Sequence, residues 1–421
     1  MFSTLRNAWK IPDLRNRILY TLLMIAIFRL GSAVPVPGIN SVALAAAFSN
    51  SEDGLLGLFN LMSGGNFKNF TIFALGISPY ITASIILNLL QIAFPSLEAL
   101  AREGEEGRKK IVRYTRYLTV VLALIQGIGF SLGYFQSFFN NPGWWSTSLA
   151  VLTLTAGTAF LMYLGEKITE NGIGNGISLF IFAGIIARVP AVTLSTITNL
   201  RIGQTNLISL IIFCVIAVLI IMGVIFIQQG QRKVPVQYAK RMVGRKMYGG
   251  QSTHIPLKVN QAGVIPVIFA ISILMFPLTI AQFIPTSSFA SFVGKWLSST
   301  SVIYNVFYAI LIIFFTYFYT NITFNPIDVA DRLKTNGGFI PGIRPGKPTA
   351  DFLGKSLNRI TIVGALFLAA IAILPNFMGA LTSTDFSFGG TSLLIVVSVS
   401  LETTKQIEAQ MMMRHYEGFL S

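Results

Sequence analysis

Residues Gly76 to Leu87 read GISPYITASIIL, and residues Gly263 to Leu274 read GVIPVIFAISIL. Aligned without a gap, the two apolar segments share Gly, Pro, Ile, Ala, Ile and Leu. A chain that repeats an apolar segment in this way is expected to contain two related halves. In membrane proteins with internal repeats, the binding site or pathway lies at the interface between the repeats. The repeat therefore indicates the functional part of the chain.

The composition is that of an integral membrane protein. The 421 residues are 53% hydrophobic and 11% charged, whereas a soluble domain has about 25% charged residues. The apolar stretches are long enough for helices, which need about 20 residues to cross ~30 Å of hydrocarbon. They lack the alternation, in segments of roughly ten residues, that is typical of a transmembrane barrel. We therefore expect an all-α polytopic membrane protein.

The apolar pattern predicts ten transmembrane helices. They cover residues 18–34, 72–94, 117–139, 149–164, 173–189, 207–227, 264–284, 302–324, 360–374 and 390–402. An even number of spans puts both termini on one side of the membrane. Most of the 31 Lys and Arg residues fall on that side, and only Lys68, Arg188, Arg201 and Lys295 fall on the other. By the positive-inside rule we expect both termini in the cytoplasm.

A second, shorter duplication supports the division into halves. Residues 176–181 read GISLFI and residues 390–395 read GTSLLI, and each segment falls in the fifth predicted helix of its half. Because five helices cross the membrane an odd number of times, the two halves must be inverted. We expect an amphipathic arm at 1–17, a first half at 18–190, an outer linker at 191–206, a second half at 207–404 and a tail at 405–421.

Overlaying the repeats selects six isoleucines, four that align in pairs and two that lie one helical turn earlier on the same faces. They are Ile81 with Ile268, Ile181 with Ile395, and the earlier Ile77 and Ile177. A core or lipid-facing role is the ordinary explanation for any one of them. Their recurrence beside Gly and Pro, where helices break or pack closely, favours a shared role.

The sequence shows no enzyme signature. It has no HExxH, no P-loop, no GxSxG and no pair of acidic residues within a predicted span. Cys214 is the single cysteine, which excludes a disulfide framework or a cysteine-based metal site. We predict no catalytic residue, no metal and no cofactor. A secondary transporter with inverted repeats remains the alternative to a channel, although such transporters usually carry acidic residues near the membrane midplane.

Two cytoplasmic connections, about 228–260 and 325–358, are longer than helix connections require. The first carries seven Lys or Arg residues and no acidic residue. Topology and contact with anionic phospholipids explain most single basic residues. The length of the connections favours a further role as docking surfaces for an acidic or large partner.

The predicted outer stretch at 35–71 is unusually apolar for a loop, and its apolar part is closed by Ser63, Gly64 and Gly65. It is either an interfacial helix that rests on the bundle or a short helix that folds back into the bundle and is released by its glycine hinge.

Seven longer motifs add a family resemblance. They are FNLMSGG at 59–65, FALGISPYITASII at 73–86, EKITENGIGNGIS at 166–178, QSTHIPLKVN at 251–260, FNP at 324–326, FIPGIRPG at 339–346 and FGGTSLLIVV at 388–397. By these motifs the whole chain resembles the SecY family, the channel-forming subunits of the bacterial Sec protein translocon. The resemblance implies a central hourglass pore between the two halves, in which the six isoleucines form a narrow ring.

The resemblance also implies a plug and a lateral gate. The plug lies at about 54–66, and its residues are Leu55, Leu56, Leu58, Phe59, Leu61, Met62, Gly64 and Gly65. The gate residues are Pro79, Thr82, Ser84, Gln126, Asn260, Pro266 and Ser272, of which Thr82, Gln126 and Asn260 are expected to form a polar cluster. Unfolded secretory polypeptides would cross through the ring, and signal sequences and transmembrane segments would leave sideways through the gate.

The family pattern implies external partners, because the channel itself performs no hydrolysis. SecA or the translating ribosome would dock on Arg232, Lys233, Lys240, Arg241, Arg245, Lys246 and Arg344. SecE and SecG are the expected membrane subunits, signal peptides and preproteins the expected substrates, and anionic phospholipids the expected lipid partners. The expected location is the bacterial cytoplasmic membrane.

Overall fold

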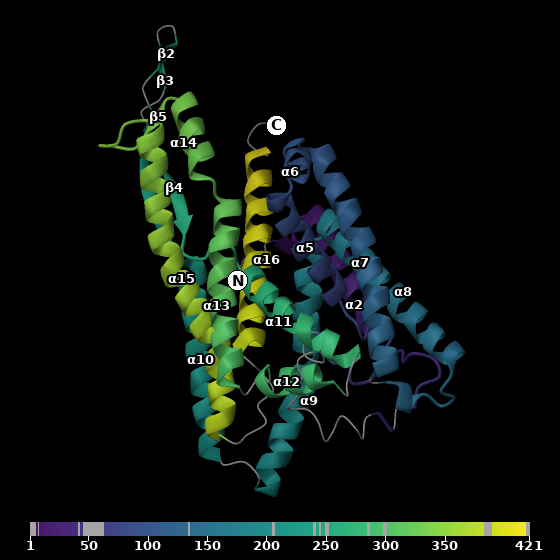
Figure 1. Cartoon of the computed structure of the whole chain (residues 1–421). Helices are drawn as coiled ribbons and strands as arrows, with labels where there is room; N and C mark the ends of the chain where they lie inside the picture. Colours follow the sequence, from purple (N-terminus) through teal and green to yellow (C-terminus); the bar gives the residue numbers. More distant parts are fainter. Residues whose placement is uncertain are drawn as a thin grey trace. The chain divides into compact units, whose positions relative to one another are not determined.

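The computed structural model describes residues 6, 8–40, 43–44, 63–133, 135–203, 207–238, 241–243, 246–248, 252–283, 287–297, 301–382 and 390–417. The chain forms two compact units, and Figure 1 labels most of their elements. The first unit comprises Met1–Leu210, Ile271–Tyr304 and Val399–Ser421. The second unit comprises Ile211–Ala270 and Asn305–Ser398.

The first unit is helical. Its elements are α2 (Pro12–Gly31), α5 (Ser78–Ala93), α6 (Pro95–Arg102), α7 (Glu105–Gly133), the short 3-10 helix η1 (Gln136–Phe138), α8 (Trp144–Asn171), α9 (Gly176–Ile202) and α12 (Ser288–Trp296). Helix α7 packs against α5 and α8, and α8 also packs against α2 and α9.

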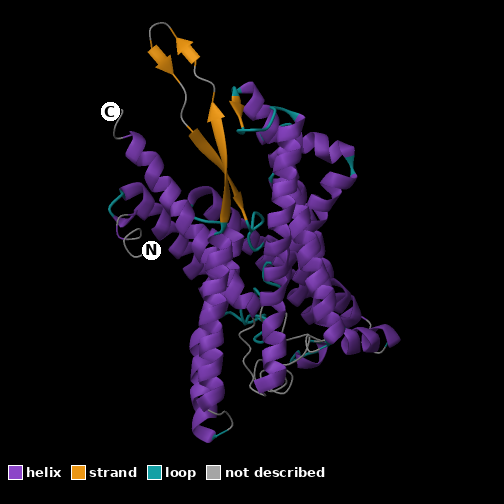
Figure 2. Cartoon of the chain, turned by 90° about the vertical axis from the view of Figure 1, so that its left-hand side faces the viewer, coloured by secondary structure: helices purple, strands orange, loops and turns teal. Residues whose placement is uncertain are grey.

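The second unit combines helices with short strands, which are drawn in orange in Figure 2. Its helices are α14 (Pro326–Thr335) and α15 (Lys347–Thr382). Four further helices contain residues of both units, namely α10 (Leu207–Gln229), α11 (Ile265–Phe283), α13 (Val302–Thr323) and α16 (Gly390–Glu417). The strands are β1 (Gln231–Tyr238), β2 (Arg241–Val243), β3 (Lys246–Tyr248), β4 (Ser252–Lys258) and β5 (Gly338–Phe339).

The predicted fold class is confirmed, because all ten predicted spans fall on helices. They correspond in order to α2, α5, α7, α8, α9, α10, α11, α13, α15 and α16. Among the described residues, α7, α8, α9, α10, α13 and α15 are each long and apolar enough to cross a membrane. Helix α5 reaches that length only together with α6, across a bend of 107°.

The second predicted span, 72–94, was too long at its start. Helix α5 begins at Ser78, because Gly76 has a φ of +56° and Pro79 occupies the first helical turn. Proline is favoured in this position, because the first N–H groups of a helix have no partner within the helix and a residue without an N–H loses no hydrogen bond there. The helix ends at Ala93, because the next residue, Phe94, has an extended backbone. Phe94 precedes Pro95, and a proline disfavours helical backbone in the residue before it.

The two long connections, predicted as loops, fold together into one layer of structure. Strand β1 pairs antiparallel with β4 and β5 in a sheet of order β4-β1-β5, and α14 and the start of α15 lie against it. Along β1, Val234 and Val236 are buried while Lys233 and Pro235 are exposed, as the period of two in a strand requires. The shared core consists of Val234, Val236, Leu257, Phe324, Leu333, Ile340, Leu353 and Leu357. We call this layer the sheet layer.

Candidate pore and gate residues

One face of α9 carries two predicted ring residues and continues beyond them. Ile177, Ile181, Gly184 and Arg188 follow at intervals of four, three and four residues, which places them in one row along the helix. Ile181 is buried and Ile177 is partly buried. The Oδ1 atom of Asn175 caps the helix by accepting from the second and third helical N–H groups at 3.1 and 3.3 Å. The cap fixes the turn that carries Ile177.

The end of the predicted plug, Gly64 and Gly65, packs against this row. A Cβ atom on Gly64 would lie 2.5 Å from the Cα of Gly184, and a Cβ atom on Gly184 would lie 2.9 Å from the Cα of Gly64. Gly64 and Gly65 have φ angles of +69° and +91°, in the left-handed region that favours glycine. A Cβ atom on Gly65 would lie 3.9 Å from the Cγ of Arg188. The segment therefore runs along α9 from Gly184 toward Arg188.

Gly184 and Arg188 were not among the predicted site residues. The signal that could have found them is the spacing, because both continue the row that begins with Ile177 and Ile181. Gly64 and Gly65 are the two predicted plug residues that the structure describes. The other six lie outside the described residues and remain a prediction; they are Leu55, Leu56, Leu58, Phe59, Leu61 and Met62.

Aromatic side chains hold the chain between the Gly64 contact and α5. Phe67 and Phe70 are fully buried against Phe130 of α7 and against Phe135. Ring centroids are 5.0 Å apart for Phe67 and Phe130 and 3.9 Å apart for Phe70 and Phe135. Each such pair adds about 0.5–1.5 kcal/mol beyond the burial of area. The Phe67 N–H also donates to the Oγ of Ser63 at 3.0 Å. This stretch gives the predicted plug a firmly packed base.

Helix α5 places two ring residues and three gate residues. Ile77 directly precedes the helix, Ile81 lies one turn later, and both are buried. The Ile81 N–H donates to the carbonyl oxygen of Ile77 at 3.0 Å. Pro79 is buried in the first turn, and Thr82 and Ser84 are partly buried. The Thr82 hydroxyl donates to the carbonyl oxygen four residues earlier at 3.0 Å.

The second unit contributes the remaining ring residues, Ile268 of α11 and Ile395 of α16, and both are buried. Asn260 is also buried; its Nδ2 donates to the carbonyl oxygen of Gly263 at 2.8 Å. Its Oδ1 has no hydrogen-bond partner among the described residues. Pro266 is likewise buried, in the first turn of α11.

Gln126 of α7 and Ser272 of α11 are buried within the first unit. The ring and the polar gate cluster each combine residues of both units. Both groupings therefore remain predictions.

Of the basic residues predicted to dock a partner, the three that the structure describes in full lie in or beside the sheet layer. Arg232 and Lys233 are exposed on β1. Arg344 is exposed in the turn between β5 and α15, where its carbonyl oxygen accepts from the Thr349 hydroxyl at 2.9 Å. Four docking residues lie wholly or partly outside the described structure. They are Lys240 and Arg245, and also Arg241 and Lys246, whose backbones lie in β2 and β3.

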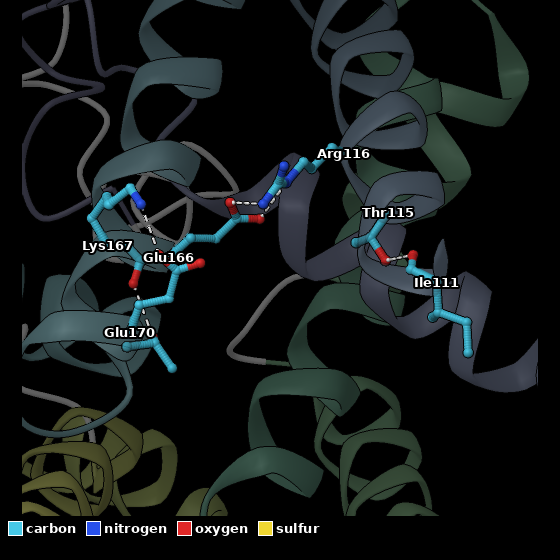
Figure 3. Close-up of polar contacts among 8 residues, drawn as sticks. Ile111, Thr115, Arg116, Glu166, Lys167 and Glu170 are labelled. Atoms are coloured by element: carbon cyan, nitrogen blue, oxygen red, sulfur yellow. Dashed lines mark hydrogen bonds and ion pairs between the residues drawn. The ribbon is translucent and has the colours of Figure 1, made fainter. Parts of the chain in front are cut away.

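An ion pair joins α7 to α8 at the end of their apolar stretches (Figure 3). The Arg116 Nε donates to Glu166 Oε1 at 2.9 Å, and Nη2 lies 2.7 Å from Oε2. Helix α8 has 28 residues, or about 42 Å at roughly 1.5 Å per residue, so its end projects beyond ~30 Å of hydrocarbon. The hydrogen bond to Glu166 raises the pKa of the Arg116 guanidinium above its usual value. A bidentate pair of this kind fixes how the two helices meet.

Comparison with known proteins gives matches over the full chain. The SecY family model matches residues 71–404. The protein translocase subunit SecY of Halalkalibacterium halodurans is 48% identical over 433 aligned positions, which cover 100% of both proteins.

Two solved structures share the fold. A protein-conducting channel has a TM-score of 0.67 at 21% identity, covering 93% of this chain and 91% of that chain. Sec61 in the canine ribosome–channel complex from the endoplasmic reticulum has a TM-score of 0.59 at 19% identity, with the same coverage.

Proposed function

The chain belongs to the SecY family, and we propose that it passes unfolded secretory polypeptides across the bacterial cytoplasmic membrane and releases apolar segments sideways into it. As a member of this family it is a protein translocase subunit that forms a protein-conducting channel. The observation that carries the assignment is the 48% identity over the whole length of both chains. The secondary transporter with inverted repeats finds no support among these relatives.

We propose that the six isoleucines close the resting pore. Ile77, Ile81 and Ile181 are buried in the first unit, and Ile268 and Ile395 are buried in the second. An aliphatic constriction offers an ion no ligands and can close by dewetting. It has no fixed hydrogen-bond geometry either, so it can surround any side chain of a passing polypeptide. Such a ring excludes ions and accepts any sequence.

The plug proposal is supported by the contact between Gly64 and Gly184. Gly64, near the end of the predicted plug, is packed against Gly184 of α9, three residues beyond the predicted ring residue Ile181. A plug that starts from this base is tethered beside the ring, so it can seal the outer funnel at rest and return there after a polypeptide has passed.

The lateral gate is proposed to lie between α5 and α11, the two helices that carry the repeat. Sorting follows from partition into lipid, since a Leu, Ile, Phe or Val near the bilayer centre contributes about −0.3 to −0.6 kcal/mol and an Asp, Lys or Arg costs about 2.5–3.5 kcal/mol. A segment of about 20 apolar residues therefore leaves through the gate, and polar chain continues across.

We propose that the chain is not an enzyme and that directional work comes from SecA or the translating ribosome. The canine relative forms a complex with the ribosome, whose phosphates suit exposed basic residues such as Arg232, Lys233 and Arg344. SecE and SecG are the proposed membrane subunits, and anionic phospholipids the proposed lipid partners. We propose that both termini lie in the cytoplasm, which the distribution of basic residues supports.

Reconstitution tests this function. The chain would be incorporated with SecE into vesicles, and protection of a preprotein from protease would be measured with and without SecA and ATP. We expect protection only when SecA and ATP are both present. Uptake of a small solute without any partner, together with no protection of the preprotein, would overturn the channel assignment.

A further inference from the structure

The junction between α8 and α9, residues 172–176, draws together parts of the first unit that are far apart in sequence. It is glycine-rich, reading GIGNG, and it directly precedes the turn that carries Ile177. Side chains from α2, α8 and α16 reach its backbone. We call residues 172–176 the α9 junction.

Three polar side chains accept hydrogen bonds from three N–H groups of the α9 junction. The Ile173 N–H donates to Oγ1 of Thr21 on α2 at 3.0 Å. The Gly174 N–H donates to Oε1 of Gln406 on α16 at 2.9 Å. The Gly176 N–H donates to Oγ1 of Thr169 on α8 at 3.0 Å. A helix end needs only acceptors for its free N–H groups, and water or its own cap can supply them. Gly176 begins α9 and Ile173 and Gly174 precede it, so here three different helices supply acceptors to the chain that leads into α9.

Apolar packing reinforces the hydrogen bonds. Ile173 is buried in one cluster with Ala8, Leu14 and Ile407, which come from the N-terminal arm, α2 and α16. On the other side, a Cβ atom on Gly176 would overlap the carbonyl oxygen of Gly165 in α8. The α9 junction therefore cannot slide against α8 or α16 without losing both kinds of contact.

The same face of α16 that meets the α9 junction also carries a ring residue. Gln406 follows Ile395 by eleven residues, which is three turns plus about 20°, and both belong to one continuous helix. The two side chains are thus in line, roughly 16 Å apart along the helix axis. Helix α16 contributes one ring residue directly, and through Gln406 it holds the start of the helix that contributes two others.

We propose that Thr21, Thr169 and Gln406 are positioning residues that hold α9 against α2 and α16, and that they thereby keep the ring narrow at rest. The proposal rests on the proposed function, because it assumes that Ile177, Ile181 and Ile395 line the closed pore. Loss of one acceptor leaves a buried N–H without a partner and frees the first turn of α9 to move. The ring then closes less tightly, although none of the three residues touches the polypeptide.

The test compares variants that differ in acceptor rather than in shape. Gln406→Met keeps the length of the side chain without an acceptor, whereas Gln406→Glu keeps an acceptor oxygen. Thr21→Val and Thr21→Ser form a second pair with the same logic. Thr404→Val serves as the control on α16, since the Thr404 hydroxyl donates to the carbonyl oxygen of Ser400 in its own helix.

Two readouts separate positioning from a general loss of stability. The first is ion conductance of resting channels in a planar bilayer. The second is export of a preprotein with a shortened apolar signal segment. We expect Gln406→Met and Thr21→Val to raise both severalfold, because a loosened ring opens without a full signal. Gln406→Glu, Thr21→Ser and Thr404→Val should stay within twofold of the unchanged chain.

A merely structural role would lower export of all preproteins together, with no gain for the shortened signal, and that result would overturn the proposal. If the Gln406→Met chain does not accumulate in the membrane, the proposal is tested with Thr21→Val alone. Valine has nearly the shape of threonine, so this variant is expected to fold. Ile81→Gly is measured in parallel. If Ile81→Gly conducts and the α9 junction variants do not, the proposal fails while the ring stands. If none of them conducts, the ring itself fails.

Discussion

Gly64 and Gly184 pack backbone against backbone, at a distance that leaves no room for a side chain on either residue. A Cβ atom on Gly184 would lie 2.9 Å from the Cα of Gly64, and neither neighbour is the flexible end of a side chain that could move aside. The base of the predicted plug and the row of α9 that carries Ile181 are therefore held at one fixed spacing.

Gly184→Ala should push the chain at Gly64 away from α9. We expect a severalfold rise in resting ion conductance and a loss of stability of about 1–3 kcal/mol, as is typical of overpacking. Gly127→Ala on α7 is the matched control, because its nearest contact, at 3.6 Å from Val151, is an ordinary one. Conductance of Gly184→Ala equal to that of the control would contradict a plug base at this contact.

Replacing a ring isoleucine by a small residue should open a leak. Ile81→Gly and Ile268→Ser remove the aliphatic bulk that closes a pore by dewetting, so the resting conductance should rise severalfold in planar bilayers. Ile125→Ser on α7 is the control, since Ile125 is 49% exposed on the surface of its helix. Equal conductance in the ring variants and the control would exclude a pore-ring role.

Cysteines on the repeat helices should lock the gate. Thr82→Cys and Ser272→Cys are introduced after Cys214→Ser, so that the two new thiols are the only cysteines in the chain. Oxidation should crosslink α5 to α11 and stop translocation of a preprotein, and reduction should restore it. Each single-cysteine chain should remain active under oxidation. Full translocation by the crosslinked double variant would mean that the two helices do not need to separate.

Reversing the charge at Arg344 should impair coupling to the motor. Arg344 is exposed in a tight turn between β5 and α15, where its side chain does not contribute to the core. Arg344→Glu should lower SecA-driven translocation at least tenfold while the chain still inserts into the membrane at normal levels. Lys347→Glu, three residues later and also exposed, should have a smaller effect. Normal export by Arg344→Glu would remove this residue from the docking surface.

The two long connections that form the sheet layer should unfold together when their shared core is weakened. Leu257 is fully buried in the core that both long connections share. Leu257→Ala should cost about 2–5 kcal/mol, and limited proteolysis should then cut 228–260 and 325–358 at similar rates. Lys233→Ala, an exposed position on the adjacent strand, should leave both resistant. Cleavage confined to 228–260 would show that the two connections fold independently.

The ten helices were predictable because a membrane span is a local property of about 20 consecutive residues. All ten predicted spans fall on helices, and the row Ile177–Ile181 could be read from the helical period. The start of α5 was placed too early because apolar residues continue back to Ile72. Only the backbone of Gly76 and the proline that follows it determine where the helix begins.

The sheet layer and the α9 junction could not be predicted from such local patterns. Strand β1 is partnered by β5 about 100 residues later, and Gly174 by Gln406 at a separation of 232 residues. A single glutamine on a helix of ordinary composition gives no signal that it accepts a hydrogen bond from the chain that leads into another helix. The close contact between Gly64 and Gly184 could not be predicted from the sequence either, since glycine is frequent in membrane helices for many reasons.

Helix α15 belongs at once to the sheet layer and to the membrane. Its first turns carry Leu353 and Leu357 of the sheet-layer core, and further along a Cβ atom on Gly364 would lie 2.5 Å from the carbonyl oxygen of Val259 at the end of β4. From Thr349 to Leu374 it contains no proline, a stretch of about 39 Å at roughly 1.5 Å per residue. A partner that displaces the Arg344 turn would therefore displace the start of a continuous helix. Because no flexible linker separates the turn from the part of α15 in the bilayer, the movement would be transmitted to that part.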